Sequence, residues 1–587
     1  MTISYTAVSQ RKLAELDARI PSEWRLSDSQ IPPGMLSPAE SVTNVKQYER
    51  VNVMDVPRTC GLLSGRELEI TEEYDARALL RAIADKRLTA EEVTTAFCKT
   101  KAMQRAAVAH QLTRCLTEPL FDRALQRARD LDAHLHRTGR PLGPLHGLPV
   151  SVKDCFHIAG VDSSIGIAAL ASRPATEDAP LVQLLTALGA IVLAKTNVPQ
   201  TMGALDSANF VFGRTLNPLS RRLSAGGSSG GEGVLVALRG CMVGFGTDIG
   251  GSIRVPAMCT GVYGFKPSVG RVPCGGQENG QIPGKGRIAL QAVAGPIARS
   301  VGDLAAVMEE IVPRAELFGE DCVPGSWAGE FPRAGPGVQR RHVTIGVLRS
   351  DGLVQPLPPV ARVLDEVART LRRTPGVEVV EIPVPAALAQ CQGLAGRLMG
   401  VDDGSAMLDL LERTGEPLIP WLQGRMKRGK ALSVVQLAQL QAQRSALEKE
   451  LLSLWMRDGD KLAGRGVDAI IHPVAPHPVP EIDRYNAVGY TSSFVLLDYP
   501  AGVIPVRRFR ETDLELGKEM TAPVLGSWDK ANRQLWNEKT VDRRVYLDSP
   551  LSIQVVTPKQ HDYELYRAME IIDRAVRAEE HKTVAKL

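Results

Sequence analysis

The sequence predicts an α/β protein, because helical patterns followed by short apolar strands recur along the chain. This alternation occurs where the helical run 179–189 meets AIVLAK (190–195), and again at VTIGVL (343–348) and VDAIIHPV (467–474). The chain has 587 residues, of which 44% are hydrophobic and 23% charged. A chain of this length and composition can bury a large core without a disulfide or metal staple.

The first 72 residues are expected to form an arm that lies on a single main domain at 73–580. The arm has a short helical pattern at 12–20 and a proline-rich patch, IPPGMLSP, at 31–38. Periodicity and a Thr89 N-cap then predict the next helices, at 74–86, 90–109 and 118–135.

The segment LPVSVKD predicts a strand, because Leu148, Val150 and Val152 alternate with more polar positions. Alternation places Ser151 and Lys153 together on the other face of that strand. Later in the chain we expect a surface connection at 312–340, one or two helices at 425–457 and a closing helix at 562–580.

Charge, cysteines and hydropathy exclude several classes of protein. A net charge of +4 is too small for this length to indicate a nucleic-acid partner. Nine cysteines without a C-x-x-C pair favour free thiols in a reducing compartment. The amino terminus lacks the apolar region of a signal peptide, and no apolar run reaches about 18 residues. We therefore expect a cytoplasmic protein with no membrane span.

The segment LSAGGSSGGEG (223–233) brings backbone and hydroxyl groups close to a potential ligand, because four glycines flank Ser228 and Ser229. A flexible loop is one interpretation, but a helical pattern follows at once. A phosphate cradle would need a G-K-[ST] ending, which is missing. Residues 226–230 match the nucleophile elbow G-x-S-x-G, but the polar residues before them do not form the strand that this elbow requires. A catalytic role remains open.

A second glycine-rich segment, GFGTDIGGSIRVP (244–256), carries Ser252 directly after two glycines. The successive N–H groups of Ile249, Gly250 and Gly251 would suit an oxyanion hole, and a plain glycine-rich turn is the alternative. Asp248 and Arg254 flank the turn and could hold its shape through charge-assisted hydrogen bonds.

Lys153 is a third candidate. A lysine at a strand end normally faces solvent, but burial would lower its pKa and free the amine to act as a base. A neutral lysine, a bridging serine and a nucleophilic serine would form a proton relay that needs neither histidine nor metal.

These three motifs, GLPVSVKD, GGSSGGEG and GTDIGGSIR, together resemble the amidase signature family. The serines follow Lys153 at intervals of 228 − 153 = 75 and 252 − 228 = 24 residues, which are similar to the family's spacing. The likeness extends to KTNVPQTM (195–202), YGFKPS (263–268) and AGPIARSVGDL (294–304), where the chain is similar to fungal acetamidases and general amidases. Residues 310–460 show no clear match.

The resemblance implies Ser252 as nucleophile, Ser228 as bridging serine after a cis peptide at Gly227, and Lys153 as base. It further implies an oxyanion hole formed by the N–H groups of residues 249–252. The expected supporting residues are Ser229, Asp248 and Arg254, and the expected substrate-binding residues are Met202 and Gly227. Next to Met202 stand Gly203 and Ala204 instead of bulky aromatics, so we expect a different pocket wall there. The run DSPLSIQ (548–554) also departs from the family pattern.

The implied fold is a large, twisted, mixed β-sheet covered by helices on both faces, with the catalytic core at 140–305. The implied activity is hydrolysis of a small-molecule carboxylic amide through an acyl-enzyme, by a homodimer without cofactor or metal. A tailoring acylase acting on one natural product, a glutamine-dependent amidotransferase subunit and a non-catalytic scaffold are the alternatives. His472 and His477 are interpreted as structural rather than metal-binding, and Cys155 as a small buried side chain.

Overall fold

The computed structural model describes residues 3–98, 105–329, 331, 342–456, 466–517 and 520–584. The strands of its main sheet are β1 (Leu116–Pro119), β2 (Pro149–Lys153), β3 (Ile191–Thr196), β6 (Val243–Asp248), β7 (Tyr263–Lys266), β8 (Val293–Ala298), β9 (Val343–Leu348), β10 (Val377–Ile382), β11 (Ala469–Pro473), β12 (Ala501–Arg508) and β13 (Pro550–Val556). A separate hairpin pairs β4 (Ala208–Asn209) with β5 (Gly213–Arg214).

The main sheet has eleven strands in the order β1-β3-β2-β6-β8-β7-β12-β13-β11-β9-β10. It is mixed: β2 runs parallel to β3 and β6, and β9 runs parallel to β10 and β11, whereas the remaining pairs are antiparallel. The strands predicted at 148–153, 190–195, 343–348 and 467–474 correspond to β2, β3, β9 and β11. The expected α/β fold with a large mixed sheet is confirmed.

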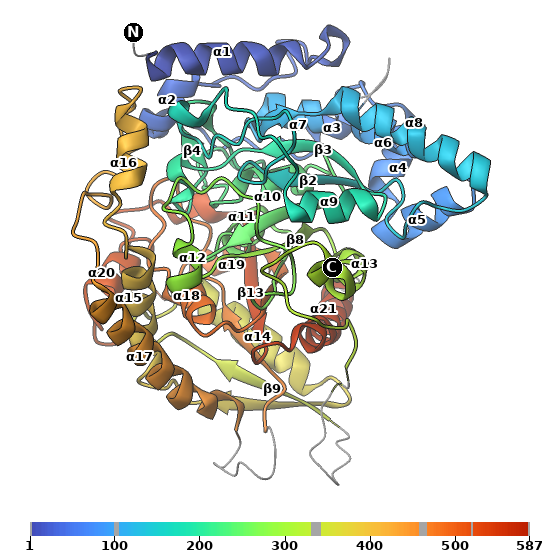
Figure 1. The fold of residues 1–587 in the computed structure, drawn as a ribbon. Coiled ribbons are helices and arrows are strands. Elements are labelled where there is room, and N and C mark those ends of the chain that lie inside the picture. Colours follow the sequence, from blue (N-terminus) through green and yellow to red (C-terminus); the bar gives the residue numbers. More distant parts are fainter. Residues whose placement is uncertain are drawn as a thin grey trace.

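Helices cover the sheet, and Figure 1 shows α1 and α17 at opposite ends of the view. The first set is α1 (Tyr5–Ala18), α2 (Pro38–Thr43), α3 (Val56–Thr59), α4 (Gly65–Glu72), α5 (Ala76–Ala84), α6 (Ala90–Cys98), α7 (Arg105–Thr113), α8 (Phe121–Thr138), α9 (Pro180–Ala187), α10 (Gly230–Ala237) and α11 (Arg254–Thr260). The second set is α12 (Lys285–Ile288), α13 (Val301–Ile311), α14 (Pro358–Arg372), α15 (Leu388–Met399), α16 (Ser405–Glu412), α17 (Val434–Leu451), α18 (Gly489–Leu496), α19 (Glu511–Leu514), α20 (Ser527–Arg533) and α21 (Asp562–Val584).

Helix α14 illustrates why these segments fold as they do. Its apolar residues recur every three or four positions, so they form one stripe that packs on β10, β11 and β13. The buried stripe comprises Val360, Val363, Leu364, Val367 and Leu371. None of the helices in the described part of the chain is both long and apolar enough to cross a membrane.

The first 72 residues are more helical than the sequence suggested. Helix α1 begins at Tyr5 and not at residue 12, because the Ser4 side chain accepts the Ala7 N–H and caps the helix. Two reciprocal capping boxes, Ser37 with Glu40 and Ser64 with Glu67, start α2 and α4. These S-x-x-E patterns are present in the sequence and would have predicted both helices.

Other predicted boundaries also differ. The expected surface connection at 312–340 begins as a 3₁₀ helix, Val312–Leu317, and its Trp327 packs edge-on against Phe265 at a ring distance of 6.0 Å. Residues 330 and 332–340 of that connection lie outside the described residues, as do 99–104 of the helix predicted at 90–109. The helices expected at 425–457 appear as α17 followed by a 3₁₀ turn at Leu452–Trp455.

Candidate active site

Lys153 ends β2 and is completely buried. Its Nζ lies 2.6 Å from Ser228 Oγ and 2.8 Å from Thr247 Oγ1. In the part of the chain that the structure describes, no carboxylate forms an ion pair with this amine. Burial disfavours the charged form, so the pKa of Lys153 is lowered from its ordinary value. The expected strand alternation holds, because Ser151 on the same face also points to α10, where it hydrogen-bonds Glu232.

The segment before α10 holds Ser228 and Ser229 against the sheet. The Gly227–Ser228 peptide is cis, and a Cβ on Gly227 would lie 2.6 Å from the carbonyl oxygen of Ala204. Only glycine can therefore bring this backbone so close to the 204–206 segment. No strand immediately precedes Ser228 in the described chain, so the nucleophile-elbow alternative lacks its required context.

Ser252 lies in the turn between β6 and α11, and its carbonyl accepts the Ser229 N–H at 3.2 Å. This backbone contact joins the two glycine-rich segments. In the turn, the N–H groups of Ile249, Gly250 and Ser252 have no hydrogen-bond partner among the described residues. They remain available to a ligand.

Gly251, the other residue expected to donate to an oxyanion, uses its N–H differently. It donates to Asp248 Oδ1 at 2.8 Å, so this group is not free. Gly251 has a φ of 133°, and a Cβ there would lie 2.6 Å from Thr491 Oγ1, which makes glycine necessary for the shape of the turn.

Asp248 and Arg254 form the ion pair that holds the turn. Both side chains are fully buried, and Arg254 donates from Nε and Nη2 to the two carboxylate oxygens at 3.0 Å each. Burial alone would raise the pKa of Asp248, but the Arg254 guanidinium holds that pKa below its ordinary value of 3.8. Arg254 also donates to Gln554 Oε1 at 3.0 Å, so the divergent run 548–554 still contacts the support of the turn.

Sequence reasoning missed two polar residues beside the lysine. Thr247 belongs to the GTDIGG motif and, at the end of β6, meets Lys153 on the neighbouring strand. Glu232 is buried in the first turn of α10, where it accepts hydrogen bonds from Ser151 and from Thr196 Oγ1. Burial raises the pKa of Glu232 to about 8. The acid in the apolar, glycine-rich GGEG run was the available signal for a buried polar role.

Met202 lies in a strained turn with a φ of 56° and is partly buried against the main core. The neighbouring Ala204 backbone contacts Gly227, so this segment adjoins the bridging serine. The space beside Gly203 is occupied by Leu422 and Met426, which belong to the 310–460 stretch where the sequence showed no clear resemblance to the family.

The residues interpreted as structural, His472, His477 and Cys155, are all buried. His472 stacks on Tyr490 and its Nδ1 lies 2.8 Å from the Leu348 carbonyl oxygen, and His477 Nδ1 lies 2.8 Å from the Pro478 carbonyl oxygen. Burial raises the pKa of Cys155 to about 11, so its thiol stays protonated at neutral pH.

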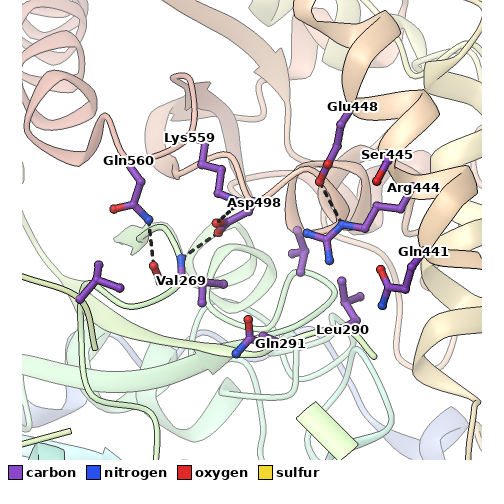
Figure 2. Close-up of a pocket in the computed structure, with 12 residues that line it drawn as sticks. Val269, Leu290, Gln291, Gln441, Arg444, Ser445, Glu448, Asp498, Lys559 and Gln560 are labelled. Carbon is purple, nitrogen blue, oxygen red and sulfur yellow. Dashed lines mark hydrogen bonds and ion pairs between the residues drawn. The ribbon is translucent and has the colours of Figure 1, made fainter. Parts of the chain in front are cut away.

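A cavity of about 470 Å³ lies between α17 and the loops at 269, 291 and 559 (Figure 2). Its charged groups are paired: Arg444 with Glu448 at 3.0 Å, and Lys559 with Asp498 at 3.2 Å. The residues that line it include neither Lys153, Ser228 nor Ser252.

Comparisons with known proteins identify the family of this chain. The family model described as Amidase matches residues 92–566. The Acetamidase of Emericella nidulans is 32% identical over 559 residues, covering 95% of each chain, and the Acetamidase of Aspergillus oryzae is 33% identical over 564 residues, covering 94% of this chain and 95% of its own. The solved structure of a fatty acid amide hydrolase superposes with a TM-score of 0.82 at 26% identity, covering 97% of this chain and 94% of its own. The chain therefore belongs to the amidase signature family of amide hydrolases.

Proposed function

We propose that the chain hydrolyses a small carboxylic amide through an acyl-enzyme on Ser252, with Ser228 as proton bridge and Lys153 as base. The observation that carries this proposal is the 2.6 Å approach of a buried lysine amine to Ser228, with no ion pair between that amine and any carboxylate of the described residues. A neutral amine has one lone pair, which accepts the Ser228 proton. Its N–H groups donate, one of them to Thr247.

In the first half-reaction, Ser252 Oγ attacks the amide carbonyl while its proton passes to Ser228 and the Ser228 proton passes to Lys153. The carbonyl oxygen becomes an oxyanion, stabilised by the free N–H groups of Ile249, Gly250 and Ser252. When the C–N bond breaks, Ser228 returns a proton to the leaving nitrogen and recovers one from Lys153. Water then attacks the acyl-enzyme through the same relay, releasing the carboxylic acid and restoring Ser252.

Asp248 and Arg254 support the reaction by fixing the shape of the 249–252 turn. Asp248 accepts the N–H groups of Gly251 and Ile253, and these bonds orient the neighbouring N–H groups. The pair is preorganised, so the turn does not need to rearrange as negative charge develops on the substrate.

We further propose a short acyl group for the substrate. Leu422 and Met426 fill the space beside Gly203, next to the Met202 segment that adjoins Gly227, which leaves less room for a long chain. Hydrolysis rates for a series from acetamide to octanamide should fall with chain length, and Met426→Ala should reduce that fall. A rate that rises with chain length in the wild type would contradict this substrate proposal. The homodimer and the cytoplasmic location stay predictions.

Labelling with a fluorophosphonate, followed by peptide mapping, tests the mechanism. We expect one adduct on Ser252, absent in Ser252→Ala and strongly slowed in Lys153→Met, while Ser229→Ala retains it. An adduct on Ser228 or Ser229 in the wild type, or no adduct on folded protein, would refute the assignment of the nucleophile.

A further inference from the structure

Two arginines at the junction between the arm and the domain carry unpaired donors. Arg221 is 1% exposed, and its Nη1 donates to the carbonyl oxygens of Pro32 and Pro33 at 3.1 and 2.8 Å. Its Nε and Nη2 are buried and have no hydrogen-bond partner among the described residues. These two nitrogens form one edge of the planar guanidinium, the edge that grips two oxygens at once.

Arg114 approaches the same place from the end of α7. Its Nη2 donates to the Leu36 carbonyl oxygen, whereas its buried Nη1 has no partner in the described chain. The Tyr48 hydroxyl is also buried without a hydrogen-bond partner. Burial lowers the pKa of Arg221, and the charge of the nearby Arg114 lowers that pKa further.

Other buried arginines in this chain show what such an edge normally binds. Arg254 uses Nε and Nη2 to grip Asp248, and Arg507 uses the same pair of nitrogens to grip Glu366. Arg214 is paired with Asp206. Neither Arg114 nor Arg221 takes part in an ion pair with any described residue.

The apolar surroundings make two unpaired guanidinium charges energetically unfavourable. Tyr48 belongs to a small apolar cluster with Leu216 and Ile482, against which Met35 and Leu36 pack. Water could satisfy single N–H groups there, but it cannot neutralise two cations in an apolar setting, and burying unpaired charge is strongly unfavourable.

We propose that a small oxyanion, a phosphate or a short carboxylate, binds between Arg221 and Arg114. The Nε/Nη2 edge of Arg221 holds two of its oxygens, Arg114 Nη1 donates to it, and the Tyr48 hydroxyl completes the site. Because both arginines also hold carbonyl groups of residues 32–36, the bound anion joins the proline-rich part of the arm to the domain.

Isothermal titration with inorganic phosphate and with acetate tests the site on the full chain after dialysis into buffer with neither anion. We expect one saturable site per chain, and the tighter of the two anions identifies the source. Arg221→Gln removes a charged pair of donors and should weaken anion binding at least about tenfold. Arg114→Gln should also weaken anion binding. The matched control is the adjacent Arg222→Gln, whose guanidinium is already paired with Glu481 at 2.6 Å. This control should bind like the wild type.

Crystals grown in selenate give a second measurement that needs no variant. We expect an anomalous peak within hydrogen-bond distance of Arg221 Nε and Nη2. Absence of both saturable binding and this peak in the wild type overturns the proposal, as does equal loss of binding in Arg222→Gln and Arg221→Gln. If Arg221→Gln does not fold, Arg114→Gln and the selenate experiment decide.

Discussion

Replacing Arg254 with methionine should both destabilise the protein and loosen the turn that carries Ser252. The change leaves the Asp248 carboxylate buried without its cation, because both side chains of the pair are fully inaccessible to solvent. Breaking a buried ion pair from one side costs about 3–5 kcal/mol. Gln554 and the Thr491 carbonyl lose a charged donor as well, so the upper half of that range is expected.

The cost should depend on pH in a defined direction. In the wild type the folded-state pKa of Asp248 lies below 3.8, so the stability it contributes is present above that value and is lost as pH falls through the folded pKa. In Arg254→Met, burial raises the pKa of Asp248 instead. Protonation then relieves the buried charge, and the stability gap between variant and wild type narrows as pH falls from 7 through this raised pKa.

Urea unfolding followed by tryptophan fluorescence measures this gap, once refolding on dilution has been verified. Arg254→Met combined with Asp248→Asn should recover at least half of the loss, because no unpaired charge remains. The control Arg222→Gln breaks a partly exposed pair with Glu481 and should cost less than about 1 kcal/mol. A loss below about 1 kcal/mol for Arg254→Met at pH 7, or a gap that is independent of pH, would refute the reasoning.

Four further outcomes are expected. Lys153→Met should lower kcat by about 10³-fold or more with the fold intact by circular dichroism; a variant with near-wild-type kcat would exclude this base. Thr247→Val removes a hydroxyl that stabilises charged Lys153, so the pKa on the acid side of the pH profile of kcat/KM should move to lower pH, and kcat/KM itself should fall about fivefold. If that pKa does not move, Thr247 has a packing role only. Glu232→Gln should retain activity. Because the pKa of Glu232 is raised to about 8, the wild type should lose stability relative to this variant as pH rises from about 5 to 8. If the free energies of urea unfolding of the wild type and the variant change with pH in the same way, the prediction is wrong. Lys12→Met leaves the buried Asp162 carboxylate without its ion-pair partner, whereas Glu118 keeps Arg19, so the variant should lose about 3 kcal/mol in the same assay; an unchanged free energy of unfolding would contradict this.

Local patterns predicted two of the strands beside the site, β2 and β3, but not β6, which carries Thr247 and Asp248. The alternation at 148–153 placed Ser151 and Lys153 on one face, and both side chains do point toward the α10 side. Continuous apolar runs predicted β3, β9 and β11, because strands covered on both faces are hydrophobic along their length. The starts of α1, α2 and α4 within the first 72 residues were missed, although their capping patterns are local.

The pairing of side chains far apart in the chain could not be derived from such patterns. Leu422 and Met426 lie beside Gly203, and the charge of Arg114 acts on Arg221, across more than a hundred residues in each case. Periodicity indicates which face of an element is buried, but it carries no information about which other element covers that face.

The sequence by itself determined the chemical groups of the site and its backbone requirements. It placed a lysine at the end of a buried strand, and it supplied two serines in glycine-rich turns, where Gly227 and Gly251 permit approaches that no Cβ would allow. Only the tertiary structure decided the electrostatic state of those groups. Lys153 is a candidate base because burial removes the solvent that would stabilise its charge, and none of the described carboxylates forms an ion pair with it. This is a property of what surrounds Lys153 in space, and it arises only when distant segments pack together, whereas the bond from the Gly251 N–H to Asp248 is local and spans three residues.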